Sequence, residues 1–106
     1  MRFLVISRSK FPAPQEAALP MLDAAMAWAQ KYKANGMMEI GFGMVGMQAG
    51  GGIANVNSLE ELNTMMQEMP FSQFSETEII PIVDLVDHLN TSKQVAQAMM
   101  AAMGGR

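Results

Sequence analysis

The chain has 106 residues, which suit one domain with one hydrophobic core, because chains usually divide into several domains only well beyond about 150 residues. Half of the residues are hydrophobic and only 16% are charged. This composition excludes a disordered chain, and the hydrophobic share is high for a small monomer, which has much surface to cover. The formal net charge is −3 and Lys and Arg form no cluster, so we expect no nucleic-acid or anionic-membrane partner.

The chain has no cysteine, one histidine and thirteen methionines. With His88 alone and no thiol, the usual zinc and iron–sulfur frameworks, a cysteine nucleophile and disulfides are excluded. We therefore expect no metal site and no cofactor. Methionine can serve as a metal ligand, as an adaptable binding surface or as core filler, and core filler is the favoured interpretation.

The N-terminal third predicts a strand followed by a helix. The apolar run 3–6 is too short for a signal peptide and is typical of a buried strand, so the expected location is the cytoplasm. A short opening turn at 15–19 and a main helix with Pro20 near its first position come next. Asn35 and Gly36 provide the stop signal of this helix.

The middle of the chain predicts an antiparallel hairpin. The stretch 40–59 carries no charge and is long enough to span a bilayer, but its six glycines make it a poor membrane helix. This part of the chain instead predicts two strands, at 37–47 and 52–57, joined by a glycine-rich turn at 48–51. Such a short connection cannot form a parallel crossover.

The next two elements are a helix and a strand. Asn57 or Ser58 is a natural N-cap for a helix with an apolar face, and Pro70 ends it. The run 78–86 is rich in Ile and Val and predicts a strand. Pro81 inside this run indicates an edge position or a bulge, and an edge strand can pair with another subunit.

The C-terminal segment predicts a last helix, capped by Thr91 or Ser92 and reaching about Met103. The element order is β-α-β-β-α-β plus this helix, which is the ferredoxin-like α+β arrangement with an antiparallel sheet. We expect residues 1–87 to form the ferredoxin-like domain and residues 88–106 a helical extension of it. Apolar residues cover more than one stripe of the last helix, so we expect it to contact two surfaces, one from a neighbouring subunit.

A helix, a proline, aromatic residues and acidic residues precede the apolar strand within residues 57–83. They are Ser58-Leu59-Glu60-Glu61-Leu62, then Met69-Pro70-Phe71, Phe74 and Glu76-Thr77-Glu78. In this order they resemble the second half of muconolactone isomerase and its relatives. The likeness covers roughly residues 1–87 once strand order is included.

The resemblance implies subunits that pair sheet to sheet as a dimeric α+β barrel, hence a homodimer or a higher homo-oligomer. It also implies movement of a proton next to a lactone carbonyl, which needs a base and donors for the enolate oxygen. The second strand departs from the family's pattern, because the isomerase carries basic and aromatic residues there. In this chain Glu39 alone could act as a base on that strand, so we expect an altered substrate or a lost activity.

Alternation along the second strand puts Glu39, Gly41 and Gly43 on one nearly bare face. Such a face leaves a cavity for a small molecule or lets another backbone approach closely, and both interpretations stay open. Glu39 is accordingly a candidate general base or a solvated charge. The same glycines match the dinucleotide pattern G-x-G-x-x-G, but no helix follows, so the match is read as chance.

Four further side chains are candidates. Arg8, just past the first strand, could orient an anionic substrate or be an ordinary surface cation. His88, at the end of the last strand, is a second candidate acid or base, or simply exposed. Phe71 and Phe74 could wall a pocket entrance or pack in the core or an interface.

Two functions follow from these observations. One is a small isomerase that holds its substrate between sheet and helices and moves a proton with Glu39. The other is a non-catalytic small-ligand-binding or assembly module of the same fold.

Overall fold

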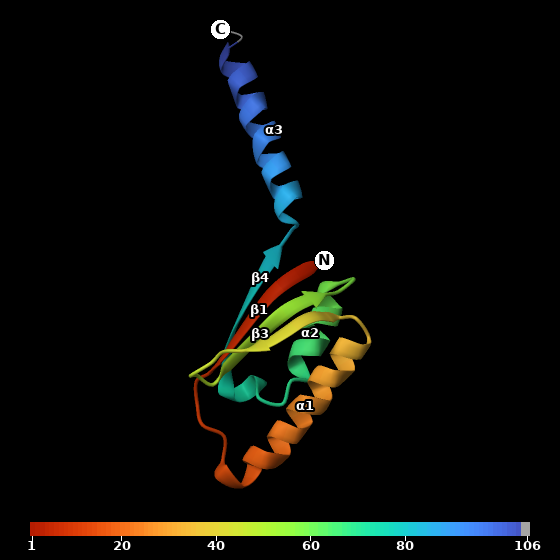
Figure 1. The fold of residues 1–106 in the computed structure, drawn as a ribbon, viewed down its shortest axis with the longest axis vertical. Helices are drawn as coiled ribbons and strands as arrows, with labels where there is room; N and C mark the ends of the chain where they lie inside the picture. Colours follow the sequence, from red (N-terminus) through yellow and green to blue (C-terminus); the bar gives the residue numbers. More distant parts are fainter. Residues whose placement is uncertain (105–106) are drawn as a thin grey trace.

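The structure, a computed structural model, describes residues 1–104 and contains one four-stranded sheet with α1 and α2 against one of its faces (Figure 1). The strands lie in the order β2-β3-β1-β4, and each neighbouring pair is antiparallel. The predicted ferredoxin-like α+β fold is confirmed. In chain order the elements are β1 (Arg2–Ser9), the 3₁₀ turn η1 (Gln15–Ala17), α1 (Ala18–Ala34), β2 (Met38–Gly43), β3 (Ala49–Asn55), α2 (Leu59–Gln67), the 3₁₀ turn η2 (Ser72–Phe74), β4 (Ser75–Ile82) and α3 (Leu85–Gly104).

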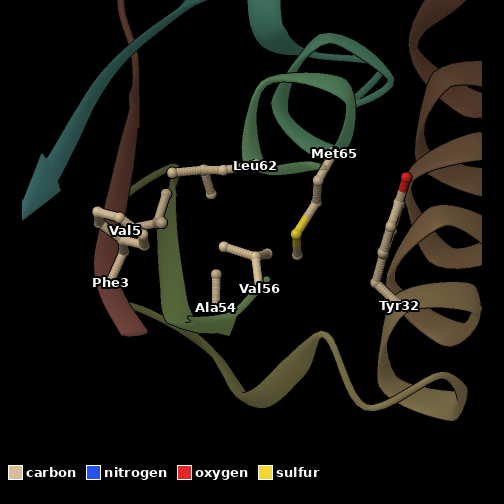
Figure 2. Packing of buried hydrophobic residues seen from close by; sticks show 7 residues of the cluster. All are labelled: Phe3, Val5, Tyr32, Ala54, Val56, Leu62 and Met65. Carbon is tan, nitrogen blue, oxygen red and sulfur yellow. The ribbon is translucent and has the colours of Figure 1, made fainter. Parts of the chain in front are cut away.

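The core lies between the sheet and the two covering helices (Figure 2). Phe3 and Val5 alternate along β1 and are buried on the helix-facing side, as a half-buried strand requires. Burial of a side chain of this size contributes about 1.5–3 kcal/mol to the free energy of unfolding. The seven buried residues of this cluster are Phe3, Val5, Tyr32, Ala54, Val56, Leu62 and Met65.

A capping box starts α2. The hydroxyl of Ser58 accepts a hydrogen bond from the backbone N–H of Glu61 at 3.2 Å. In return the carboxylate of Glu61 accepts one from the backbone N–H of Asn57 at 2.8 Å. The predicted start of this helix is confirmed, and it turns Leu62 and Met65 toward the sheet.

Hydrogen bonds join α1 to α2 and the residues that follow it. The indole N–H of Trp28 donates to the carbonyl oxygen of Met65 at 2.9 Å. The hydroxyl of Tyr32 donates to the carboxylate of Glu68, which also accepts from the ammonium of Lys31 at 3.1 Å. These contacts connect α1, including the only tryptophan of the chain, to α2 and to Glu68 just after it.

The face of the sheet opposite α1 and α2, here called the outer face, carries an open apolar row between charged side chains. One row across all four strands consists of Ile40, Ile53, Leu4 and Ile80. Ile40 remains 55% exposed and Ile80 41% exposed, and Phe42 beside this row is 43% exposed. An uncovered row of aliphatic side chains is typical of a surface that meets another chain.

The end of the last strand differs from the prediction, because β4 ends at Ile82 and α3 begins at Leu85. The carboxylate of Asp84 accepts a hydrogen bond from the backbone N–H of Val86 at 3.1 Å, which starts the helix early. The predicted cap at Thr91 or Ser92 is therefore wrong. Both hydroxyls lie inside α3 and donate to carbonyl oxygens four residues earlier, each at 3.0 Å.

The hairpin turn also lies earlier than predicted. β2 ends at Gly43 rather than at residue 47, and Gly46 adopts a φ of 85°, which glycine tolerates. The backbone N–H of Met44 closes the turn by donating to the carbonyl oxygen of Ala49 at 2.9 Å. The edge position predicted from Pro81 is confirmed, because β4 is the last strand of the order.

Helix α3 extends away from the sheet and from α1 and α2 (Figure 1). None of its described residues is buried. The chain measures 71 × 27 × 23 Å and has a radius of gyration of 18.9 Å, against about 13 Å for a compact domain of this length. No helix in residues 1–104 is long and apolar enough to cross a membrane.

The link between Tyr32 and Glu68 predicts a specific loss of stability in acid. The hydrogen bond from Tyr32, followed by that from Lys31, holds the pKa of Glu68 below its ordinary 4.5. The resulting stabilisation is present above that value and is lost as the pH falls through the lower pKa of the folded state. We expect the melting temperature of Glu68→Gln to fall less steeply than that of the wild type between about pH 5 and pH 3.

The control is Glu60→Gln, which removes a carboxylate from the first turn of α2 and leaves Tyr32 and Lys31 untouched. This variant should follow the wild-type curve more closely than Glu68→Gln does. Identical acid profiles for Glu68→Gln and the wild type would contradict the assignment.

Candidate functional site

A bulge in β2 decides which side chains face the helices. Met38 lies opposite Ala54, yet Ile40 lies opposite Ile53, so Glu39 is one residue more than its partner strand supplies. Such an insertion places two successive side chains on one face. The prediction that Glu39 shares a face with the glycines of β2 is therefore wrong.

Glu39 lies on the outer face with Arg2 and Asn55. Its carboxylate accepts from the guanidinium of Arg2 at 2.7 Å and from the side-chain amide of Asn55 at 2.9 Å. The hydrogen bond from Arg2 lowers the pKa of Glu39. A carboxylate that holds its proton so weakly is a poorer general base than an ordinary glutamate.

A cleft of about 1020 Å³ opens between the helix-facing side of the sheet and the helices. Two directly opposed pairs of glycines line it from the sheet, Gly41 with Gly52 and Gly43 with Gly50. We call these four residues the glycine floor. Beside it, Val5 of β1 and Ala54 of β3 complete the apolar base of the cleft.

The two strands use their glycines for different purposes. A Cβ atom at Gly52 would collide with the carbonyl oxygen of Ile40, and one at Gly50 would lie 2.9 Å from that of Phe42. A Cβ atom at Gly43 would meet nothing within 4 Å, and one at Gly41 would meet only the side chain of Met38. Both interpretations of the bare face therefore hold: β3 needs glycine for close backbone approach, and β2 leaves space.

The lining of the cleft is apolar and rich in methionine. Six methionines contribute to it, so the chain uses these residues as cleft wall as well as core filler. Among the described lining residues Lys33 is the one with a charged side chain, and neither a carboxylate nor an imidazole is present. The methionines are Met38, Met44, Met47, Met65, Met66 and Met69, and the polar residues are Ser7, Ser9, Gln30, Gln48 and Ser75.

The predicted site residues fall into separate places. Gly41, Gly43 and Phe71 line the cleft together, whereas Phe74 is half-buried in η2 and does not line it. Arg8 lies within β1, not past it, and pairs with the carboxylate of Glu78 at 2.6 Å. Its place in the alternation of β1 is on the outer face, so it does not reach the cleft.

His88 lies in the first turn of α3, not at the end of a strand as predicted, and its side chain is exposed. Helix α3 extends away from the sheet and from α1 and α2 (Figure 1), and His88 is not among the residues that line the cleft. Within residues 1–104, no three acidic or histidine side chains gather closely enough to hold a metal ion.

The helix side of the cleft was not predicted from the sequence. Trp28 and Lys33 come from α1, and Met66 comes from α2. The one available signal was the single tryptophan in the middle of the first helix. A large amphipathic ring there indicates a boundary between core and open space.

Comparisons with known proteins agree with this fold. A family model described as muconolactone delta-isomerase matches residues 1–90. A crystal structure of muconolactone isomerase is similar with a TM-score of 0.70 and 22% identity, over 79% of this chain and 90% of that one. No curated protein matches the sequence.

A second solved structure is similar over 74% of this chain and 91% of its own, with a TM-score of 0.55 and 21% identity. It is the 5-chloro-2-hydroxyhydroquinone dehydrochlorinase of Burkholderia phenoliruptrix AC1100 in complex with 2,5-dihydroxybenzoquinone. At these identities the two structures show the likeness of fold alone.

The different roles of the glycines predict different effects of adding one methyl group. Gly52→Ala places a Cβ atom against the carbonyl oxygen of Ile40, so we expect it to lower the free energy of unfolding by roughly 1–3 kcal/mol. Gly43→Ala points into open space and should leave that free energy nearly unchanged. Urea unfolding of the two variants measures the difference, and equal stabilities would contradict the proposed close approach of β2 to β3.

Proposed function

The chain belongs to the muconolactone delta-isomerase family, and from that premise we propose that it is a small oligomeric isomerase that moves a proton next to the carbonyl of a lactone-like or related metabolite. The observation that carries the proposal is the open cleft over the glycine floor. A concave, mostly apolar site with a few polar groups is what a small organic substrate requires.

The polar groups of the cleft suit the stabilisation of a carbonyl or enolate oxygen. Ser7 offers a hydroxyl from β1, and Gln48 offers an amide. Lys33 supplies a positive charge at the cleft and forms no ion pair with another described residue. Ser7, Gln48 and Lys33 are the proposed substrate-orienting residues.

The proposed base is not one of the residues that line the cleft, because that lining contains neither a carboxylate nor an imidazole. Glu39 is held on the outer face by Arg2 and has a lowered pKa, so it is the weaker of the two candidates. His88 lies on α3, which extends away from its own domain, so it can reach a cleft only in another subunit. The proposal therefore ranks His88 ahead of Glu39.

The proposed partner is a second copy of the chain. The open row on the outer face and the uncovered α3 are both apolar surfaces that a single chain leaves exposed. Pairing of two outer faces would bury the row of Ile40, Ile53, Leu4 and Ile80 and form a dimeric α+β barrel. Location in the cytoplasm stays a prediction.

A non-catalytic ligand-binding module of the same fold is the alternative. The observation that favours it is that the described cleft lining contains neither a carboxylate nor an imidazole. Under this alternative the cleft binds a small molecule without changing it, and His88 has no chemical role.

Catalysis can be tested by following proton exchange and isomerisation of muconolactone and other unsaturated lactones in D₂O by NMR. For the isomerase we expect His88→Asn to reduce turnover about 10²–10⁴-fold, because it removes a positioned base. Glu39→Gln should cause a smaller loss. Unchanged melting temperatures show that both variants fold, and turnover that is equal in His88→Asn and wild type would contradict the assignment of the base.

The oligomer can be tested by light scattering at micromolar concentration. We expect the wild type to be a dimer or a multiple of one, and Ile80→Glu to weaken it, because the charge would be buried in the paired faces. Leu19→Glu is the matched control, since Leu19 is 75% exposed at the start of α1. A wild-type monomer of 11.5 kDa would contradict the proposed architecture.

Removal of α3 completes the oligomer test. None of its described residues is buried in the single chain, so deletion of residues 85–106 should leave the domain folded. It should also lower the association constant or yield a smaller assembly. An unchanged oligomer after the deletion would contradict a role of α3 in assembly.

A further inference from the structure

The glycine floor gives the cleft a shape that selects among ligands. Gly41 and Gly43 are both exposed, and their partners Gly52 and Gly50 bring only backbone to the same area. Four glycines on two adjacent strands leave a stretch of sheet surface from which no side chain projects. A flat molecule can contact such a surface over its whole area, whereas a puckered one contacts it at a few atoms.

The other side of the cleft is built from polarisable groups. Trp28 of α1 and Met66 of α2 line it, together with Met69 and Phe71 beyond α2. Thioether sulfurs and aromatic rings both interact favourably with aromatic rings, and methionine adapts to irregular outlines. These residues favour a ring system rather than a flexible chain.

The charges of the cleft exclude one class of ligand. Lys33 is the one charged side chain among the described lining residues, so a cation would lose its water without gaining an opposite charge. A carbonyl, a hydroxyl or one negative charge could instead be met by Lys33, Ser7 or Gln48. The volume of about 1020 Å³ also exceeds what a single small ring requires.

We propose that the cleft selects a planar, largely apolar compound of two or more fused rings without positive charge, which lies flat on the glycine floor. This inference rests on the proposed function only in taking the cleft as the ligand site. Gly43 is the specificity-determining position, because a side chain there would enter the space that the ring occupies.

Isothermal calorimetry on the full chain can test the inference with three probes. They are 1,4-naphthoquinone, which is flat and neutral, 2-decalone, which is puckered, and 2-naphthylmethylammonium, which is flat and cationic. We expect naphthoquinone to bind at least about 10-fold more tightly than either of the others. It should also quench the fluorescence of Trp28, the only tryptophan of the chain.

The matched variants are Gly43→Leu and Gly104→Leu, because a Cβ atom meets nothing within 4 Å at either position. Gly43→Leu should weaken the binding of naphthoquinone at least about 10-fold, and Gly104→Leu should leave it unchanged. Equal binding of naphthoquinone and 2-decalone, or no effect of Gly43→Leu, would overturn the inference.

Two outcomes separate this inference from the proposed isomerase. Lactone turnover without any preference for the flat probe would overturn the inference and leave the isomerase standing. Binding of the flat probe without turnover of any lactone would support the inference and favour the binding module.

A change of oligomer size in Gly43→Leu, with naphthoquinone binding intact, would show that a protein segment fills the cleft and would overturn the inference.

Discussion

The bulge at Glu39 determines the character of both faces of the sheet. Because Arg2 and Asn55 hold the extra residue on the outer face, Ile40 follows it there and Gly41 turns toward the helices. Without the bulge, period-two alternation would place the glycines outside and the large apolar side chains of β2 in the cleft. The contacts of Glu39 with Arg2 and Asn55 therefore accompany two features: an open cleft on the helix-facing side of the sheet, and a row of apolar side chains on the outer face.

This division explains how a short chain can combine an open cleft with an exposed apolar surface. The seven-residue core fixes the helices against β1 and β3, while the β2 side of the same interface stays open over the glycine floor. The outer face and α3 expose apolar side chains that the domain itself cannot cover.

Most of the fold could be predicted because its signals are local. The cap at Ser58 and the edge position of Pro81 depend on neighbouring residues, and both are confirmed. The bulge could not be predicted, because Arg2 lies 37 residues from Glu39 in the sequence. The early start of α3 was missed because Leu85 and Val86 continue an apolar run, although Asp84 before them is a capping residue. Of the candidate site, Gly41, Gly43 and Phe71 could be predicted from the sequence. Trp28 and Lys33 could not, because their position at the cleft depends on how α1 packs against the sheet.

Occupation of the cleft by a small molecule, directly over the glycine floor, can be tested on the free protein in solution. The most direct measurement is a titration of the ¹⁵N-labelled protein with 1,4-naphthoquinone, followed by the backbone amide signals. We expect the largest shifts at Gly41, Gly43, Gly50 and Gly52, whose amides are distinctive, and no shift at Ile80 on the outer face. Shifts concentrated on the outer face or along α3, with the four glycine signals unmoved, would contradict this expectation.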